Sequence, residues 1–172
     1  MWYRLRYVDD VMKLNLEKSY MEFSSAHFLV GKELCERLHG HNYRVRIVID
    51  GKPGEDGMII DFLILKEVAD RLCSEYDHKL LLPLRNPSLK ITDENDSLKV
   101  KTAEGKIYVL PKEDVLGLDI KNTTCEELAR DYCRKLVERL SEKTATAGLK
   151  SVSTTVEEAD GQGATETIFF SD

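Results

Sequence analysis

The sequence predicts an α+β fold in which an antiparallel, four-stranded sheet carries two helices on one face. Three observations predict it. Segments near both ends of the chain alternate apolar and polar residues, as half-buried strands do. Two segments between them repeat apolar residues at helical spacing. The resulting order, two strands, two helices and two strands, favours a hairpin on either side of a helix pair.

The first two strands are expected at residues 20–30 and 42–50. The second reads Asn-Tyr-Arg-Val-Arg-Ile-Val-Ile-Asp, which alternates in character and is rich in β-branched residues. Residues 1–18 precede this pair and can add a further strand. We expect the strands at residues 20–30 and 42–50 to pair as antiparallel neighbours.

Each helix begins at a residue suited to cap it. Asp61 is a good N-cap for the first helix, and the run from Thr124 to Glu127 has the spacing of a capping box. The apolar face of the first helix comprises Phe62, Leu65, Val68, Ala69, Leu72, Cys73 and Tyr76. That of the second comprises Leu128, Ala129, Tyr132, Cys133, Leu136, Val137 and Leu140. Both faces are expected in the core.

The last two strands are expected at residues 149–158 and 164–170, with a glycine-containing turn between them. A long insertion, residues 84–120, separates the two helices. Within it, residues 97–102 and 106–110 flank a turn that contains Gly105, which predicts an inserted hairpin. The length of 172 residues is that of a single domain, 1–172.

Composition limits the classes of function. The net charge of −6 argues against a general nucleic-acid binder, which needs a basic surface. No apolar run is long enough to span a membrane, and acidic residues near the N-terminus stand where a secretory signal would be apolar. The four cysteines show no CxxC spacing and no disulfide framework. We therefore expect a cytoplasmic protein.

Three of the four histidines fall in two short stretches, which end at His27 and at His41. His39 and His41 project from the same face if a strand begins near them, and Gly40 between them allows a close approach of backbone. An antiparallel partner strand that ends at His27 would bring a third imidazole beside these two, which gives three possible ligands for one metal ion. Three neutral imidazoles with an open fourth position are typical of a catalytic zinc site.

Cys35 lies four residues before His39. A thiol beside a dication and imidazoles has a lowered pKa, so Cys35 could be a fourth ligand or a nearby base. A His-x-His pair alone is more often structural than metal-binding. The residues by themselves leave these alternatives open.

Four motifs follow one another along the chain: Phe-Ser-Ser-Ala-His27, Cys35-x-x-x-His39-Gly-His41, Gly57-Met-Ile-Ile-Asp61-Phe62 and Asp77-His78. Taken together, these motifs resemble the 6-pyruvoyl-tetrahydropterin synthase superfamily, and most of all its 6-carboxy-tetrahydropterin synthase branch. The resemblance covers residues 20–83 and returns at 121–166. It implies the T-fold, or tunnelling fold, in which subunits join their sheets edge to edge into a barrel.

The resemblance implies roles for these residues. Zinc ligands map onto His27, His39 and His41, and Cys35 matches the catalytic cysteine, here taken as the general base. Asp77 and His78 match a proton-relay pair. Without the resemblance, the last two would be interpreted as the cap at the end of a helix.

A carboxylate in the last strand pair is implied as the anchor of the pterin ring, whose guanidine-like edge offers neighbouring N–H donors. Glu158 aligns with that residue, and Glu157 is the competitor one position away. Thr124 and Cys125 align with residues that contact the pterin from a neighbouring subunit. The alternative for Thr124 is the helix cap alone, and both can hold.

The implied activity is zinc-dependent conversion of 7,8-dihydroneopterin triphosphate to 6-carboxy-5,6,7,8-tetrahydropterin, which feeds 7-deazaguanine (queuosine and archaeosine) biosynthesis. The three residues between Cys35 and His39 favour this branch. Alternatives are 6-pyruvoyl-tetrahydropterin synthesis, or side-chain cleavage to 6-hydroxymethyl-dihydropterin with Glu33 or Glu36 as base. A further alternative is a zinc- or pterin-binding module without turnover. The resemblance also implies a homo-oligomer built from trimers, with a hexamer expected.

Overall fold

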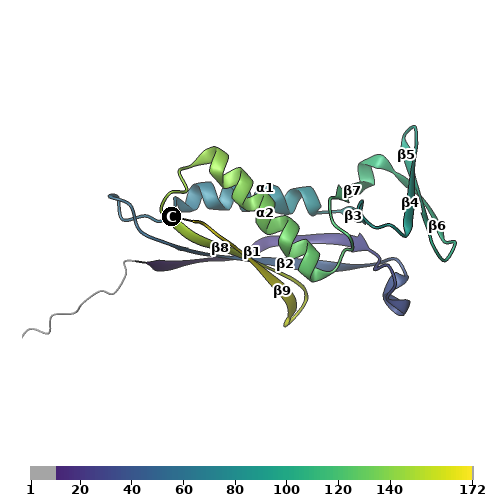
Figure 1. Cartoon of the computed structure of the whole chain (residues 1–172), viewed down its shortest axis with the longest axis horizontal. Coiled ribbons are helices and arrows are strands. Elements are labelled where there is room, and N and C mark those ends of the chain that lie inside the picture. Colours follow the sequence, from purple (N-terminus) through teal and green to yellow (C-terminus); the bar gives the residue numbers. More distant parts are fainter. Residues whose placement is uncertain (1–10, 172) are drawn as a thin grey trace, which may run out of the picture.

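The structure, a computed structural model, describes residues 11–171 (Figure 1). Part of the predicted N-terminal strand, residues 1–10, lies outside this range, whereas residues 12–18 belong to β1. The elements in chain order are β1 (Met12–His27), the 3-10 helix η1 (Glu33–Glu36), β2 (His39–Gly51), α1 (Phe62–Tyr76), β3 (Lys79–Pro83), β4 (Leu89–Glu94), β5 (Ser97–Thr102), β6 (Ile107–Pro111), the 3-10 helix η2 (Lys112–Asp114), β7 (Val115–Leu118), α2 (Cys125–Lys143), β8 (Leu149–Ala159) and β9 (Gln162–Phe169).

The main sheet has six strands in the order β7-β3-β1-β2-β8-β9, which corrects the prediction of four. The four expected strands are β1, β2, β8 and β9, and they pair antiparallel. β3 and β7 extend the sheet beyond β1 in parallel pairing. β3 reads Lys-Leu-Leu-Leu-Pro and buries its last four residues, so its sequence lacks the alternation that reveals a half-buried strand.

Both helices cover one face of this sheet, with α2 over β8 and β9 and α1 over β1 (Figure 1). The predicted caps are present. Asp61 accepts a hydrogen bond from Leu63 N at 2.7 Å, and Thr124 accepts one from Glu127 N at 3.4 Å. The Glu127 carboxylate pairs with Arg130. Of the residues predicted on the apolar helix faces, Phe62 is 43% exposed and Val137 is half-buried, whereas the others are buried.

The insertion forms a separate three-stranded antiparallel sheet, β4-β5-β6, which corrects the predicted hairpin. β5 and β6 match that hairpin. β4 was missed because its sequence, Leu-Lys-Ile-Thr-Asp-Glu, ends in acidic residues and has only two apolar positions. A second core joins this sheet to the end of the main one and comprises Phe28, Leu80, Leu82 and Val100.

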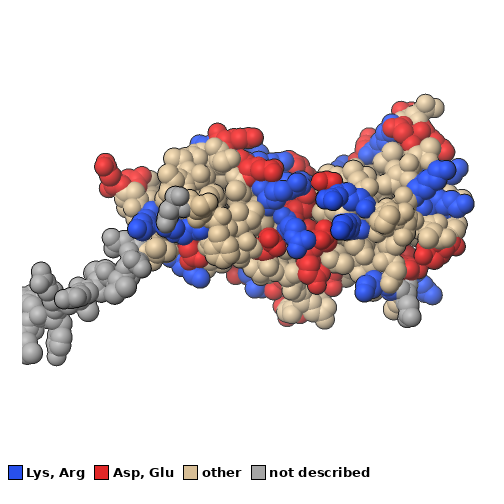
Figure 2. Space-filling model, in the orientation of Figure 1, with Lys and Arg blue, Asp and Glu red and all other residues tan. Residues whose placement is uncertain are grey.

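Cationic and anionic side chains are intermingled on the face shown in Figure 2. Within residues 11–171, neither helix is long and apolar enough to cross a membrane.

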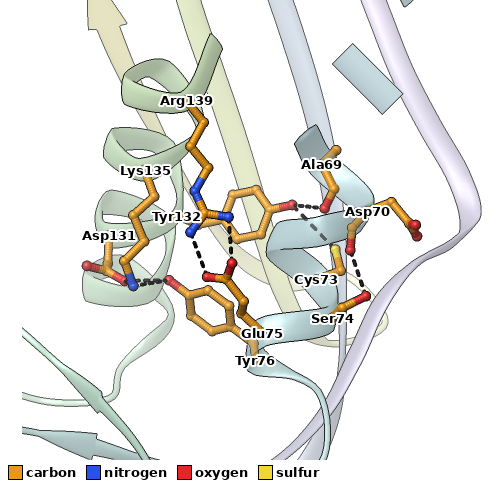
Figure 3. Close-up of polar contacts among 10 residues, drawn as sticks. All are labelled: Ala69, Asp70, Cys73, Ser74, Glu75, Tyr76, Asp131, Tyr132, Lys135 and Arg139. Carbon is orange, nitrogen blue, oxygen red and sulfur yellow. Dashed lines mark hydrogen bonds and ion pairs between the residues drawn. The ribbon is translucent and has the colours of Figure 1, made fainter. Parts of the chain in front are cut away.

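A polar network joins α1 to α2 around Asp131, which is 2% exposed (Figure 3). Its carboxylate accepts a hydrogen bond from the Tyr76 hydroxyl and forms ion pairs with Lys135 at 2.7 Å and Arg134 at 3.0 Å. A buried carboxylate is stable only with such partners. The network therefore fixes Tyr76, the last residue of α1, against α2.

We expect Asp131→Ala to lower the free energy of unfolding by about 3 kcal/mol, because it leaves a buried hydroxyl and nearby cations without their anion. Glu75→Ala is the matched control, since Glu75 forms a bidentate but exposed pair with Arg139 between the same helices. That control should cost less than about 1 kcal/mol. Chemical denaturation at fixed protein concentration measures both. Equal losses would contradict the importance given to Asp131.

Candidate functional site

The three histidines of the two sequence clusters come together where β1 ends and β2 begins. His27 pairs with His39 in the register of the two strands, and His41 lies two residues further along β2. One ring nitrogen from each lies within 4.8 Å of the others. The cluster shares the helix-covered face of the sheet with buried Tyr43. This arrangement is able to hold a metal ion.

Two of the rings are fixed in one tautomer by main-chain carbonyls. His27 Nδ1 lies 2.9 Å from the Thr123 oxygen, and His39 Nδ1 lies 2.7 Å from the Arg37 oxygen. Because a carbonyl only accepts, each Nδ1 must carry the proton, which leaves each neutral ring with a bare Nε2. Carbonyl partners of this kind commonly orient metal-binding histidines.

The two Nε2 atoms of His27 and His39 are 3.1 Å apart. Two bare nitrogens at this distance repel each other unless a cation lies between them. Ligand atoms of tetrahedral zinc are separated by roughly 3.3 Å, given zinc–nitrogen bonds of about 2.0–2.1 Å. The spacing and the donor set therefore fit zinc.

Burial keeps His27 neutral. Its 1% exposure lowers its pKa to about 4, and proximity to His39 and His41 acts in the same direction, against the opposing hydrogen bond to Thr123 and the charge of Glu158. A neutral imidazole is the metal-binding form.

Gly40 permits this spacing, as the sequence predicted. A Cβ atom at Gly40 would lie 2.9 Å from the Ser25 carbonyl oxygen, closer than real contacts of this kind. The atoms it would meet are β1 backbone and therefore cannot yield easily. Glycine allows the two strands to pair tightly between His39 and His41.

Cys35 lies in η1, in the connection between β1 and β2, and is half-buried. The metal-capable cluster found among the described residues comprises the three histidines and does not include its sulfur. The Cys35 carbonyl accepts a hydrogen bond from Leu29 N at 2.8 Å, which closes the connection on itself. This placement separates Cys35 from the three candidate ligands.

Asp77 and His78 follow α1 directly and are bound to β1. Asp77 accepts from Ser24 N at 2.8 Å and pairs with His78 Nδ1 at 2.7 Å, and His78 N donates to the Ser24 carbonyl at 2.7 Å. Partial burial opposes ionisation of Asp77, but the hydrogen bonds from Ser24 and His78 hold its pKa below the usual range. Asp77 is also the C-cap of α1, whereas the His78 side chain is 84% exposed.

The two adjacent glutamates of β8 have different partners. Glu157 is 7% exposed, and both of its carboxylate oxygens accept from Arg46 Nη2, at 2.8 and 2.7 Å. Glu158 accepts a hydrogen bond from Cys125 Sγ at 3.4 Å. Burial raises the pKa of Cys125 to about 12, with the charge of Glu158 adding to it, so the sulfur stays a protonated donor.

This contact places Cys125 beside Glu158 within a single chain. Thr124 and Cys125 were expected to approach the site from a neighbouring subunit. The contact between Cys125 and Glu158, however, needs no second subunit. Thr124 is the N-cap of α2, as its alternative interpretation predicted.

Two surface cavities meet at His41. One, of about 650 Å³, is lined by His41, His78 and Lys79 among others. The other, of about 330 Å³, is lined by His41, Glu157 and Glu158 among others. His41 thus lies between the relay pair predicted from the sequence and the predicted anchor.

Sequence reasoning missed two residues that shape the cluster. The Tyr43 hydroxyl lies 3.3 Å from both ring nitrogens of His27. Its position two residues after His41, on the same strand face, was a usable signal. Thr123 contributes a carbonyl from the segment before α2, and no local sequence pattern predicts such a contact.

The metal-free protein should lose stability as the pH falls from about 6.5 to about 4. His27 titrates at about 4 in the fold against 6.5 when unperturbed, so between these values the unfolded state binds more protons. Denaturation in the presence of a chelator, repeated across this range, measures the slope. His27→Gln removes this titration and should flatten it. Equal slopes in both proteins would contradict the assignment.

Comparison with known proteins gives a consistent result. The sequence model of the family described as 6-pyruvoyl tetrahydropterin synthase matches residues 16–167. A protein of Methanocaldococcus jannaschii, provisionally named 6-carboxy-5,6,7,8-tetrahydropterin synthase, is 33% identical over 155 residues, covering 90% of this chain and 94% of the relative. The crystal structure of 6-pyruvoyl tetrahydropterin synthase from Plasmodium vivax has a TM-score of 0.88 and 32% identity, covering 94% of this chain and 100% of that one.

Three further matches concern the chemistry of relatives. A Pyrococcus furiosus protein named dihydroneopterin monophosphate aldolase is 41% identical over 59 residues, covering 34% of this chain and 50% of the relative. Two more structures of the Plasmodium vivax enzyme replace a glutamate, described as a catalytic residue, by alanine or cysteine. Because the family model matches most of the sequence, and because similarity to the archaeal relative spans nearly all of both chains, this chain belongs to the 6-pyruvoyl tetrahydropterin synthase family.

Proposed function

We propose that this protein is a zinc-dependent synthase that converts 7,8-dihydroneopterin triphosphate into 6-carboxy-5,6,7,8-tetrahydropterin, with loss of triphosphate and acetaldehyde. The observation that carries the proposal is the three-histidine cluster, which meets one cavity leading to Glu158 and another leading to His78. A substrate with a ring at one end and a reactive side chain at the other fits this pair of cavities.

His27, His39 and His41 would hold the zinc. Bound there, zinc acts as a Lewis acid that makes the protons next to the substrate side-chain hydroxyls more acidic. Burial keeps His27 neutral, and the carbonyls of Thr123 and Arg37 fix the rings of His27 and His39.

Cys35 would act as the general base that accepts a proton from the substrate side chain. It suits this role because it lies outside the histidine cluster, so its sulfur need not be a ligand. Asp77 would hold the Nδ1 proton of His78 through their 2.7 Å contact, leaving Nε2 to exchange protons in the larger cavity.

Glu158 would anchor the pterin through two hydrogen bonds from the guanidine-like edge of the ring. The choice over Glu157 rests on partners. Arg46 already occupies both oxygens of Glu157, whereas Glu158 has a weak thiol donor that a ligand can displace. Thr124 and Cys125 would line the same end of the substrate.

The alternatives within the family are 6-pyruvoyl-tetrahydropterin synthesis and cleavage to 6-hydroxymethyl-dihydropterin, the latter with a glutamate base. Glu36 is poorly placed for that role, because its carboxylate accepts from Gly31 N at 3.0 Å and lies 3.5 Å from Lys106 Nζ. The Glu33 side chain lies outside the described part of the structure. A module that binds zinc or pterin without turnover is the remaining alternative.

We infer a homo-oligomer built from trimers, with a hexamer expected. Among the described strands, β7 and β9 form the two edges of the main sheet. Phe169, the last residue of β9, is 78% exposed, which also suits burial against another subunit. Pairing edge strands between subunits satisfies their unpaired backbone groups.

Incubation with 7,8-dihydroneopterin triphosphate, followed by mass identification of the pterin, tests the function. We expect 6-carboxy-5,6,7,8-tetrahydropterin together with acetaldehyde. A 6-pyruvoyl or 6-hydroxymethyl product would select one of the alternatives, and the absence of any product from zinc-loaded protein would favour the binding module.

The division of roles at the metal has its own test. We expect Cys35→Ala to retain one zinc per subunit and lose turnover, because three imidazoles suffice to hold the ion. The double variant His39→Ala, His41→Ala should lose the zinc. Elemental analysis of the purified proteins measures both. Loss of zinc from Cys35→Ala would make the thiol a ligand, and stoichiometric zinc in the double variant would refute the site.

A further inference from the structure

The connection between β1 and β2, residues 28–38, carries Cys35 and is held at several points. The Asn122 side chain accepts from Val30 N at 3.1 Å and donates to the Val30 carbonyl at 3.2 Å. Thr123 Oγ1 donates to the Phe28 carbonyl at 3.0 Å. These contacts fix the first residues of the connection, next to His27. Around Cys35, the main chain is held by hydrogen bonds from Leu29 N to the Cys35 carbonyl at 2.8 Å and from Cys35 N to the Lys32 carbonyl at 3.0 Å.

Glu36, the neighbour of Cys35, adds side-chain contacts to these main-chain hydrogen bonds. One carboxylate oxygen of Glu36 accepts from Gly31 N at 3.0 Å, which joins the two ends of the turn that contains η1. Its side chain is only 19% exposed. Glu36 therefore helps to hold the turn from which the Cys35 side chain extends.

Glu36 is in turn bound by the second sheet. Lys106, at the turn between β5 and β6, lies with its Nζ 3.5 Å from the other Glu36 oxygen and donates to the Glu36 carbonyl at 3.3 Å. Nearby, the rings of Phe28 and Tyr108 stack at 5.2 Å with an interplanar angle of 14°. Phe28 belongs to the second core, and Tyr108 is partly buried against it. The inserted sheet thus contacts the Cys35 connection through one polar and one aromatic interaction.

We propose that the inserted sheet β4-β5-β6 positions Cys35, and that Lys106 is the positioning residue, acting through Glu36. A cation that contacts both the carbonyl and the carboxylate of one residue restricts its main chain and side chain together. Because Cys35 precedes Glu36 directly, this restriction sets where the thiol lies relative to the histidines. The mechanistic part of this inference rests on the proposed role of Cys35 as the base.

The experiment measures the thiol itself as well as turnover. Iodoacetamide alkylation of Cys35, followed by peptide mass mapping, reports how firmly the connection is held, and it requires no substrate. In Lys106→Met we expect alkylation of Cys35 to become about two- to fivefold faster, the change produced by losing one partly exposed ion pair. We expect kcat to fall by about tenfold with KM within about twofold, because a displaced base affects chemistry more than binding.

Lys106→Arg keeps the charge, so its alkylation rate at Cys35 and its kcat should both be close to those of the wild-type protein. Lys99→Met is the matched control, since Lys99 is 43% exposed against 39% for Lys106 and also lies 3.5 Å from a glutamate, Glu94, but within the inserted sheet. It should leave alkylation and kcat unchanged.

Alkylation of Cys35 at the wild-type rate in Lys106→Met would overturn the proposal, as would an equal effect of Lys99→Met. If Lys106→Met fails to fold, Glu36→Gln replaces it. Glu36→Gln removes the ion pair and should accelerate alkylation in the same way, and an unchanged rate there would again overturn the proposal. If alkylation responds to Lys106 while the wild-type protein forms no pterin product, the positioning is supported and the proposed function fails.

Discussion

The register between β1 and β2 is the constraint on which the candidate site depends. It places His27 opposite His39, with His41 opposite Ser25. Because side chains alternate along a strand, a slip of one residue would turn the two β2 histidines away from His27. Two contacts hold this register. The backbones of β1 and β2 approach closely at Gly40, and in the core Phe23 of β1 stacks on Tyr43 of β2, with ring centres 4.9 Å apart. The histidine cluster is thus a consequence of strand pairing.

The same core connects this cluster to the helix pair. The Tyr43 hydroxyl contacts His27, Phe23 stacks on Tyr43, and Tyr76 packs against Phe23 with ring centres 5.1 Å apart. Tyr76 also binds Asp131 of α2 through its hydroxyl and accepts from Ser25 Oγ through its carbonyl. The proposed relay pair, Asp77 and His78, follows Tyr76 directly, so the contacts that hold Tyr76 also hold the start of that pair.

Local sequence patterns predicted those parts of the structure that have a local cause. The alternation in β2, the caps at Asp61 and Thr124 and the histidine spacing all act over a few residues. β3 could not be recognised in this way, because a short strand buried on both faces has no period. The choice between Glu157 and Glu158 required Arg46, more than a hundred residues away in the chain, and the contact of Lys106 with Glu36 joins segments that no spacing rule connects.

The protons of the histidine cluster are assigned by residues outside the two strands. Arg37 lies in the connection that precedes β2, and Thr123 lies just before α2, yet their carbonyls decide which nitrogen of His39 and His27 is free. A shift of either segment would rotate a ring or release its proton. The strands therefore bring the imidazoles together, whereas the connections leave one ring nitrogen of His27 and one of His39 free to bind a metal. The connection between β1 and β2 contains both Cys35, the proposed base, and Arg37, whose carbonyl orients His39. A change in the conformation of this connection would therefore affect the proposed base and one proposed ligand together.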